Sequence, residues 1–374
     1  MVYILDLLNS SRLTAICQYH LGVQQKLTNS KINTEKQRKQ HNNSEDYIIN
    51  NKLVNWIAHA SSELAGEPFY HVFYPSCAWL FEVHLARKNI LMLSTMMYIG
   101  QALKDIIKQP RPESPPVIRL ESTYVTEYGM PSTHSVLGVT VPFSFILFLS
   151  QTYEVPPYYY KLAVVWSSLV ATSRIYLGMH TAMQVIVGCF IPAVTITVVS
   201  PYIDLFEKMQ IEGSSYVSFV TALVIFGASG LLFYIDRTVD LKTKKIKWTS
   251  SRGDTAEILG WCAGFLIGTR WCQNNLLHEI NYSSILNKYF GDYPTCYCLF
   301  KFISGAVILA PSTLLVRKIF CHLFIFINGK QHEPIFISKK QRLIEWPYKF
   351  LSVFTSATMA TCIIPRLYKA INLW

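Results

Sequence analysis

Charged residues are scarce in this sequence of 374 residues. Asp, Glu, Lys and Arg together make up 15% of the chain, whereas hydrophobic residues make up 51% and aromatic residues 14%. A soluble domain of this size usually carries about a quarter charged residues. The composition therefore excludes an ordinary soluble globular protein and predicts a membrane protein.

Several functional signatures are also missing. No basic helix with interleaved aromatic residues supports nucleic-acid binding, so we attribute the net charge of +11 to Lys and Arg that flank membrane helices. Cys296 and Cys298 form a lone C-x-C without a second pair, which argues against a zinc site. No carboxylate cluster is present to hold magnesium. We expect no metal, no other cofactor and no nucleic-acid partner.

The N-terminus lacks the usual form of a cleavable signal peptide. Its first apolar residues, 1–8, are interrupted by Asp6 and followed by a polar segment. We therefore expect the first membrane helix to direct insertion.

The apolar residues fall into blocks, most of them about the 20 residues that a helix needs to cross a bilayer. The blocks are 89–107, 136–153, 160–177, 182–202, 216–235, 256–268, 297–316 and 350–368. A shorter stretch at 69–83, broken by Pro75, can span, re-enter or lie in the interface. The predicted fold is all-α, a multi-spanning transmembrane helix bundle of about 8 to 10 spans.

The chain divides into three parts by composition. Residues 1–50 are polar and predict a disordered or peripheral N-terminal arm. Residues 51–205 form the predicted catalytic membrane core, in which 54–66 can form an amphipathic surface helix. Residues 206–374 contribute C-terminal membrane helices.

Two polar patches flank the long loop after the span at 89–107. In the first, KDIIKQPRP, Lys104 lies on the last turns of the span and Arg111 in the loop, because Pro110 and Pro112 disfavour helix just before them. The second, PSTH at 131–134, directly precedes the span at 136–153. A helix start offers free N–H groups and a positive dipole end, so this patch predicts an anion cradle beside His134.

A third patch, SRIYLGMH, joins the next two spans. Arg174 ends one span and His180 begins the other, with Gly178 as the helix stop between them. One loop and then two spans separate the patches, so all three lie on the same membrane face.

Together the patches suit phosphoryl transfer. They supply cations, hydroxyl donors and two imidazoles: Lys104, Arg111, Arg174, Ser132, Thr133, His134 and His180. A phosphate monoester carries about 1.5 to 2 negative charges, and its transfer transition state spreads charge over three oxygens, which three cations match. One imidazole attacks phosphorus while the other protonates the leaving alkoxide, and the cations take the place of a metal.

These patches resemble the signature of the type 2 phosphatidic acid phosphatase superfamily: Lys, six residues, Arg-Pro; Pro-Ser-x-His; and Ser-Arg, five residues, His. The stretches YIGQALKDIIKQPRPESPPVIRLE, EYGMPSTHS, SRIYLGMH and SRGDTAEILG are similar to the sphingosine-1-phosphate phosphatases of the endoplasmic reticulum. The resemblance covers about residues 65–370.

The resemblance implies a role for each matching residue. His180 becomes the nucleophile of a phosphohistidine intermediate, and His134 the acid for the leaving group. The implied phosphate binders are Lys104, Arg111, Ser132, Thr133 and Arg174. The implied reaction converts a long-chain base 1-phosphate and water into the free base and phosphate, in the endoplasmic reticulum membrane.

One position departs from the family pattern. Gln184 stands four residues after His180, where the family has an Asp that would fix the imidazole tautomer and stabilise its cation. Gln accepts the same hydrogen bond without contributing charge, which predicts impaired catalysis or a substitute carboxylate. Asp254 and Glu257 are the candidate substitutes, and both also suit a structural role.

Three readings of function remain open. The first is an active lipid phosphate phosphatase, the second a silent binder of lipid phosphate that lost turnover through Gln184, and the third a phosphatase for another phospholipid or a polyprenyl pyrophosphate. Glu121 or Glu127 can contact a substrate ammonium, or both can be solvated loop acids. Oligomeric state is open.

Overall fold

The structure, a computed structural model, describes residues 2–25, 47–80, 82–121, 127–235, 238–239, 246–247, 251–276, 294–328 and 339–370. Helices account for most of them: α1 Val2–Leu8, α2 Ser11–His20, α3 Lys52–Glu63, α4 Glu67–Leu80, α5 Val83–Ile107, α6 Thr133–Leu149, α7 Tyr158–Tyr176, α8 Ala182–Glu212, α9 Ser215–Ile235, α10 Ser251–Leu276, α12 Pro294–Asn328, α13 Lys339–Thr358 and α14 Ile364–Ala370. A π-helical turn, η2 (Met359–Ile363), joins α13 to α14. The all-α prediction is confirmed.

The strands are short. β1 (Val23–Gln25) pairs antiparallel with β2 (Tyr47–Ile49), with Gln24 opposite Ile48. β3 (Thr238–Val239) pairs antiparallel with β4 (Ile246–Lys247), with Thr238 opposite Lys247.

The predicted apolar blocks lie mostly on helices, from α5 to α14. Within the described residues, four helical stretches are long and apolar enough to cross a membrane: Val83–Ile107, Ala182–Glu212, Cys298–Phe324 and Trp346–Ala370. Thr133–Leu149 and Tyr216–Leu231 are shorter apolar helices. The doubtful block at 69–83 forms α4, and its residues Tyr74 and Trp79 are buried in the core.

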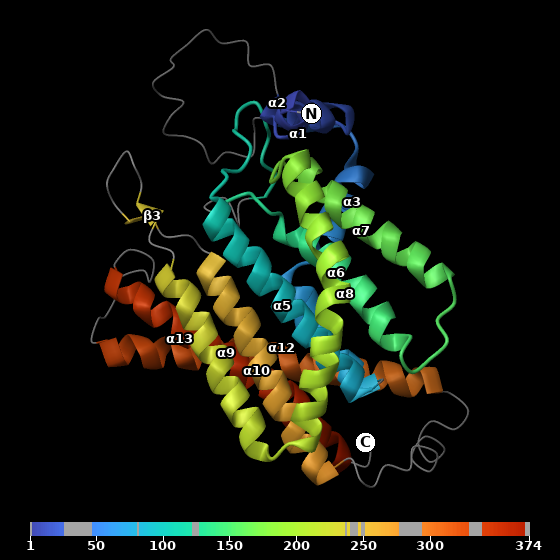
Figure 1. The fold of residues 1–374 in the computed structure, drawn as a ribbon, viewed down its shortest axis with the longest axis vertical. Helices are drawn as coiled ribbons and strands as arrows, with labels where there is room; N and C mark the ends of the chain where they lie inside the picture. Colours follow the sequence, from blue (N-terminus) through green and yellow to red (C-terminus); the bar gives the residue numbers. More distant parts are fainter. Residues whose placement is uncertain are drawn as a thin grey trace.

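Four helices, α5 to α8, pack together as the core that carries the three sequence patches. In Figure 1, the C-terminal ends of α5 and α7 and the N-terminal ends of α6 and α8 lie at one end of the bundle, below α1 and α2. Gly188 lets α8 approach α6 closely, because a Cβ at this position would lie 2.6 Å from the carbonyl oxygen of Ser132. This packing brings the three sequence patches to the same end.

The C-terminal helices pack against this core through α10, which contacts α5, α9 and α13. α12 lies across the direction of the other long helices in Figure 1 and contacts α4 and α13. Hydropathy predicts the length of such a helix but carries no information about its direction.

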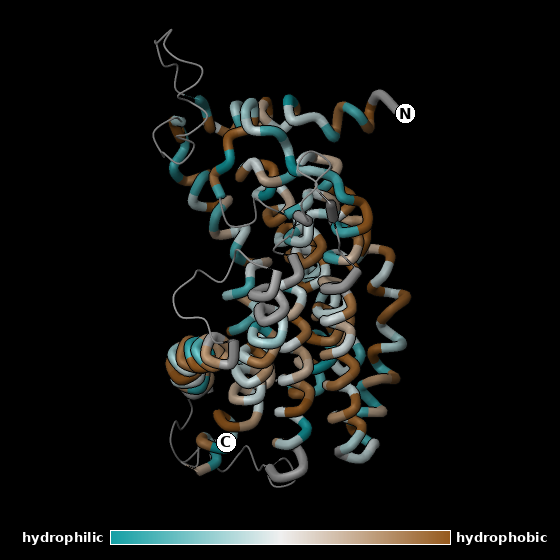
Figure 2. The backbone as a smooth tube through the Cα atoms, turned by 90° about the vertical axis from the view of Figure 1, so that its left-hand side faces the viewer, coloured by the Kyte–Doolittle hydropathy of each residue, from teal (hydrophilic) through white to brown (hydrophobic). Residues whose placement is uncertain are grey.

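The outer faces of the long helices are apolar and exposed. On α8, Phe190, Val194, Val198, Tyr202 and Leu205 point away from the protein, with Phe190 66% exposed. In Figure 2 brown apolar segments recur along the length of the bundle. An exposed apolar surface of this extent is typical of helices that face lipid.

Part of the predicted N-terminal arm is ordered. Residues 2–25 form α1, α2 and β1, so this stretch of the predicted arm is folded. Gln18 of α2 is buried and hydrogen-bonds to both Ile118 and the carbonyl oxygen of Tyr176. Residues 26–46 of the arm lie outside the described residues. The predicted amphipathic helix at 54–66 corresponds to α3.

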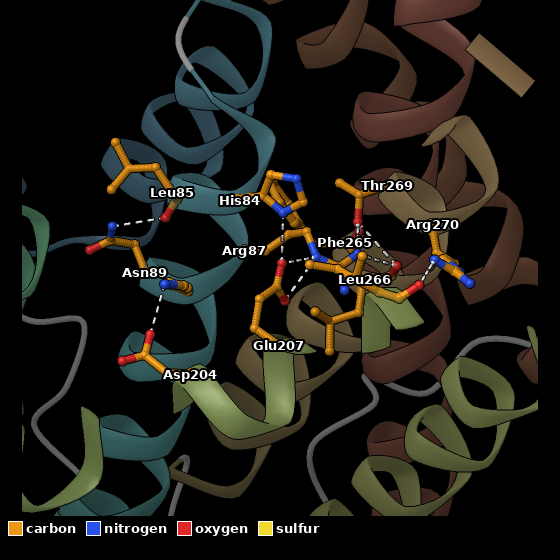
Figure 3. Close-up of polar contacts among 12 residues, drawn as sticks. His84, Leu85, Arg87, Asn89, Asp204, Glu207, Phe265, Leu266, Thr269 and Arg270 are labelled. Carbon is orange, nitrogen blue, oxygen red and sulfur yellow. Dashed lines mark hydrogen bonds and ion pairs between the residues drawn. The ribbon is translucent and has the colours of Figure 1, made fainter. Parts of the chain in front are cut away.

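A buried ion pair holds the opposite end of the bundle together (Figure 3). Arg87 of α5 donates through Nε to both carboxylate oxygens of Glu207 of α8, at 2.7 and 3.0 Å. Its Nη1 donates to Thr269 Oγ1 at 2.6 Å and to the carbonyl oxygen of Leu266 at 3.2 Å. The cluster of Arg87, Glu207, Leu266 and Thr269, here called the distal clamp, therefore joins α5 and α8 to α10.

Breaking the distal clamp should destabilise the fold strongly. Glu207→Ala leaves the fully buried guanidinium of Arg87 without its counter-ion, which typically costs about 3–5 kcal/mol. Glu212→Ala, on the same helix, is the matched control, since Glu212 is 66% exposed in its pair with Lys208. Thermal unfolding in detergent should show a large loss of stability for the first variant only, and similar losses for both would contradict a role for the clamp.

Candidate phosphate-binding site

Lys104 lies on the last turn of α5 and points into the protein. The helix ends at Lys108, which adopts the left-handed conformation with φ of 55°, so the chain turns into the loop that carries Arg111. Lys104 Nζ lies 2.7 Å from Glu127 Oε2 and donates to Thr133 Oγ1 at 3.1 Å. The side chain is almost completely buried.

Arg111 connects the loop to the third patch. Its Nη1 donates to the carbonyl oxygen of Met179 and lies 3.0 Å from Nε2 of His180. Its Nε donates to the backbone oxygen of Glu127 at 3.2 Å, and its Nη2 lies 3.7 Å from the Glu127 carboxylate. The first and third patches, 69 residues apart at this contact, therefore meet directly.

The hydrogen bonds of His180 define its tautomer. Nδ1 lies 2.8 Å from the carbonyl oxygen of Gly129, which can only accept, so Nδ1 carries the proton. Nε2 faces the Arg111 guanidinium, which can only donate, so Nε2 presents its lone pair. A neutral imidazole with an unprotonated Nε2 is the form required of a nucleophile.

Gln184 links the three patches to one another. Its Oε1 accepts from the Thr181 backbone N–H in a capping box and lies 3.2 Å from His180 Nδ1. Its Nε2 donates to the carbonyl oxygen of Pro110 at 2.8 Å, and its backbone oxygen accepts from Ser132 N–H at 3.1 Å.

Gly129 lies against this amide. A Cβ at position 129 would lie 2.5 Å from Gln184 Nε2, so a larger residue would have to displace this amide. The carbonyl oxygen of Gly129 can therefore reach Nδ1 of His180 more closely than Gln184 Oε1 does.

Arg174 ends α7 and is fully buried. Its Nη1 donates to Ser62 of α3 and to Glu121 Oε2 at 2.9 Å. Its carbonyl oxygen accepts from the backbone N–H groups of Met179 and His180 and so closes the turn between α7 and α8. The turn places His180 beside the guanidiniums of Arg111 and Arg174.

Ser132, Thr133 and His134 form the start of α6. Ser132 is the N-cap, whose Oγ accepts from the Ser135 backbone N–H and from the Ser135 hydroxyl. Thr133 accepts from Lys104. Electrostatic interactions link His134 with Arg174, Lys104, Arg111 and His180.

Burial and neighbouring charges shift the pKa values of the loop residues. Burial first, and then the positive charges of Arg111, Arg174 and Lys104, hold the pKa of His180 well below 6.5. Burial lowers the pKa of Arg111 to about 10. Burial alone would raise the pKa of Glu127, but Lys104 and Arg111 lower it to about 2, so Glu127 is an anion in the folded protein.

Two acids that sequence reasoning left open are now placed. Glu127 is not a solvated loop acid, because its side chain is 2% exposed and bound to Lys104. Glu121 pairs with Arg174 and is 18% exposed. The position of both acids in the loop between the first two patches indicated that they could lie near the site. The sequence does not show which cation each acid approaches.

The candidate substitutes for the missing Asp interact elsewhere. Asp254 hydrogen-bonds to Glu127, and Glu257 pairs with Arg317 and Lys349. In the described part of the chain, the side-chain partners of His180 are Gly129, Gln184 and Arg111. Across the same residues no three His, Cys, Asp or Glu side chains gather as metal ligands, and cations converge at the site instead.

Comparison with known proteins agrees with this geometry. Residues 86–208 match the model of the PAP2 superfamily. Human sphingosine-1-phosphate phosphatase 2 is 30% identical over 337 residues, which cover 87% of this chain and 80% of that protein. This chain belongs to the sphingosine-1-phosphate phosphatase family of the PAP2 superfamily.

Other relatives match over all or part of this length. Rat sphingosine-1-phosphate phosphatase 1 is 29% identical over 334 residues, covering 87% of this chain and 74% of that protein. A dihydrosphingosine 1-phosphate phosphatase of Saccharomyces cerevisiae is 34% identical over 140 residues, 36% of this chain and 35% of that protein. No solved structure matches the chain. The PAP2 match covers α5 to α8 almost completely and therefore contains all three patches.

Replacing Gln184 by Asp should not increase turnover. The carbonyl of Gly129 already holds Nδ1 of His180, and the shorter carboxylate loses the donation to Pro110, a loss of about 1–3 kcal/mol for a buried acceptor. We expect an unchanged or reduced kcat for lipid phosphate hydrolysis. Gln210→Asp is the matched control, since Gln210 is buried at the other end of α8. A gain approaching about 10⁴ would instead show that a missing charge limits catalysis.

The low pKa of His180 predicts the acid side of the pH profile. Since folded His180 takes a proton only well below pH 6.5, kcat/KM should rise with pH on the acid side of the profile as His180 loses its proton. Arg111→Gln removes a charge that lowers this pKa and should move the rise to higher pH. Lys208→Gln, exposed near the far end of α8, should leave the profile unchanged. An identical acid limb in wild type and Arg111→Gln would contradict the assignment.

Proposed function

We propose that this protein hydrolyses the phosphate monoester of a long-chain sphingoid base, releasing the free base and phosphate through a phosphohistidine intermediate. The observation that supports it most is the contact between Arg111 and His180 Nε2, beside Lys104 and Arg174 at one end of the bundle. The printed names of the relatives, phosphatases of sphingosine 1-phosphate and dihydrosphingosine 1-phosphate, support the substrate class.

The first step forms a phosphorus–nitrogen bond. His180 Nε2 donates its lone pair to phosphorus while the bond from phosphorus to the lipid oxygen breaks. His134, the proposed acid, gives its proton to that oxygen, and the free base leaves as an alcohol. Lys104, Arg111 and Arg174 stabilise the charge on the equatorial oxygens.

The second step regenerates the enzyme. A water molecule attacks the phosphorus of the phosphohistidine as His134 takes up a proton from the water, and the bond from phosphorus to His180 Nε2 breaks. Phosphate then leaves with the oxygen of that water. The cations perform the charge stabilisation without a metal, so chelators should not affect turnover.

The carboxylates of the site suit an ammonium-bearing substrate. Each proposed phosphate-binding cation pairs with Glu127 or Glu121, so a phosphate that enters must share these cations with acids. A long-chain base phosphate carries its ammonium a few bonds from the phosphate, where such a carboxylate can accept it. A phosphate without a cation brings only repulsion to the same carboxylates.

Gln184 favours a second candidate, a protein that binds lipid phosphate without turnover. The amide contributes no charge to stabilise an imidazolium. Against this stands the hydrogen bond from Nδ1 of His180 to Gly129, which orients the ring without a side-chain carboxylate. We therefore favour the active enzyme, and we propose the endoplasmic reticulum as the membrane in which it lies.

Trapping of the intermediate distinguishes the two candidates. Purified protein in detergent with sphingosine 1-phosphate labelled in its phosphate should release phosphate and, when quenched, carry an acid-labile label. His180→Ala should abolish both, with phosphate release falling at least about 10³-fold. Tight binding of the labelled lipid without release would favour the silent binder, and release that persists in His180→Ala would refute the nucleophile.

A further inference from the structure

A cavity of about 560 Å³ lies between α5, α8, α9 and α10, away from the catalytic residues. This volume is within the range of about 300–1,000 Å³ that ligand pockets occupy. Residues that represent the four walls are Leu91, Tyr98, Val199, Ile203, Ile225 and Leu259. Among the described residues that line it, none is charged.

Three polar side chains of the walls hydrogen-bond within the protein. Thr95 donates to the carbonyl oxygen of Leu91, and Tyr98 donates to that of Ala228. Thr221 accepts from Gln210. A cavity whose walls carry no charge and few polar groups favours an apolar guest.

The cavity opens sideways, and the distal clamp lies beyond one of its ends. α8 and α9 diverge from their connecting turn at Gly213 in Figure 1, and two residues at the opening, Tyr202 and Val224, are 68% and 65% exposed. One helical turn beyond Leu91 and Ile203 lies the distal clamp with Arg87 and Glu207 (Figure 3). A guest thus enters from the apolar flank and stops at the clamp.

The distance from Lys104 to the cavity matches the length of a lipid chain whose head group is held at the end of the bundle that carries Lys104. Leu91 and Lys104 lie on the same helix, 13 residues and therefore about 20 Å apart along its axis. A lipid chain descends through half of a hydrocarbon core of about 30 Å, which is a similar depth. α10 makes the same connection, because it carries both Leu259 and Asp254, the hydrogen-bond partner of Glu127.

We propose that this cavity receives the single alkyl chain of the long-chain base phosphate whose head group binds at Lys104 and Arg111. The proposal rests on the proposed function for the identity of the head group. The chain enters between α8 and α9 and extends from Tyr98 towards the distal clamp. The C-terminal helices α9 and α10 thereby take part in selecting substrate by chain length.

Filling the cavity tests this proposal. Val199→Trp places an indole in the cavity, whereas Val198→Trp, the matched control, places it on the adjacent outward face, where Val198 is 61% exposed. Each variant is assayed with two sphingoid base phosphates, one long enough to reach Leu91 and one too short to pass Tyr98. Val199→Trp should lower the ratio of kcat/KM for the long over the short substrate about tenfold or more. The control should keep the wild-type ratio.

Photolabelling makes the test independent of turnover. A long-chain base phosphate with a photoreactive group at its chain terminus should label peptides of α8, α9 or α10 that line the cavity. The same labelling should occur in His180→Ala, which does not turn over the substrate. Val199→Trp should abolish the labelling in either background. If wild-type protein releases no phosphate but the label maps to the cavity, the proposed function fails and the chain site stands.

Two results would overturn the proposal. One is an unchanged ratio of long over short substrate in Val199→Trp. The other is labelling of the cavity by a photoreactive phosphatidylcholine that the base phosphate does not displace, because a bulk membrane lipid would then be the occupant.

Discussion

Positive charge buried at the end of an apolar bundle is the constraint on which this site depends. Lys104, Arg111 and Arg174 are nearly inaccessible to water, where an uncompensated cation is very costly. The loop between the first two patches compensates them with Glu127 and Glu121. The return of this loop over the cations also brings the Gly129 carbonyl to His180. Charge compensation and orientation of the imidazole therefore come from the same segment.

The sequence predicted those parts of the site that consist of side chains at helix ends. Proline pairs and a glycine mark where α5 and α7 stop, so Lys104, Arg111, Arg174 and His180 could be assigned to one face before any coordinates. It could not predict the orienting group of His180, because a backbone carbonyl belongs to every residue type. The structure also gives Gln184 a bond to Pro110 that requires an amide, which a search for a missing carboxylate does not anticipate.

The fold, like the site, could be predicted in part from the sequence. Apolar blocks gave the helices and the all-α class, since block length and helix length are tied by the bilayer. Polar composition suggested that the first residues were not part of the fold, yet Gln18 and Asn9 hydrogen-bond to the end of α7, the loop after α5 and the start of α8. A few side-chain amides are sufficient to bind a polar segment to the helix bundle. The average composition of the segment does not show that its amides make such contacts.

Ser132 shows how helix capping determines which hydrogen-bonding groups the start of α6 can offer to a bound molecule. Its oxygen already accepts from the Ser135 N–H and the Ser135 hydroxyl, so both lone pairs are occupied and only its own O–H remains to be offered. Lys104, Arg111 and Arg174 likewise have hydrogens and no lone pairs to present. A guest must bring lone pairs at each of these positions, which a fully ionised phosphoryl group does. The start of α6 therefore favours groups rich in acceptor oxygens over groups that can only donate, such as an ammonium.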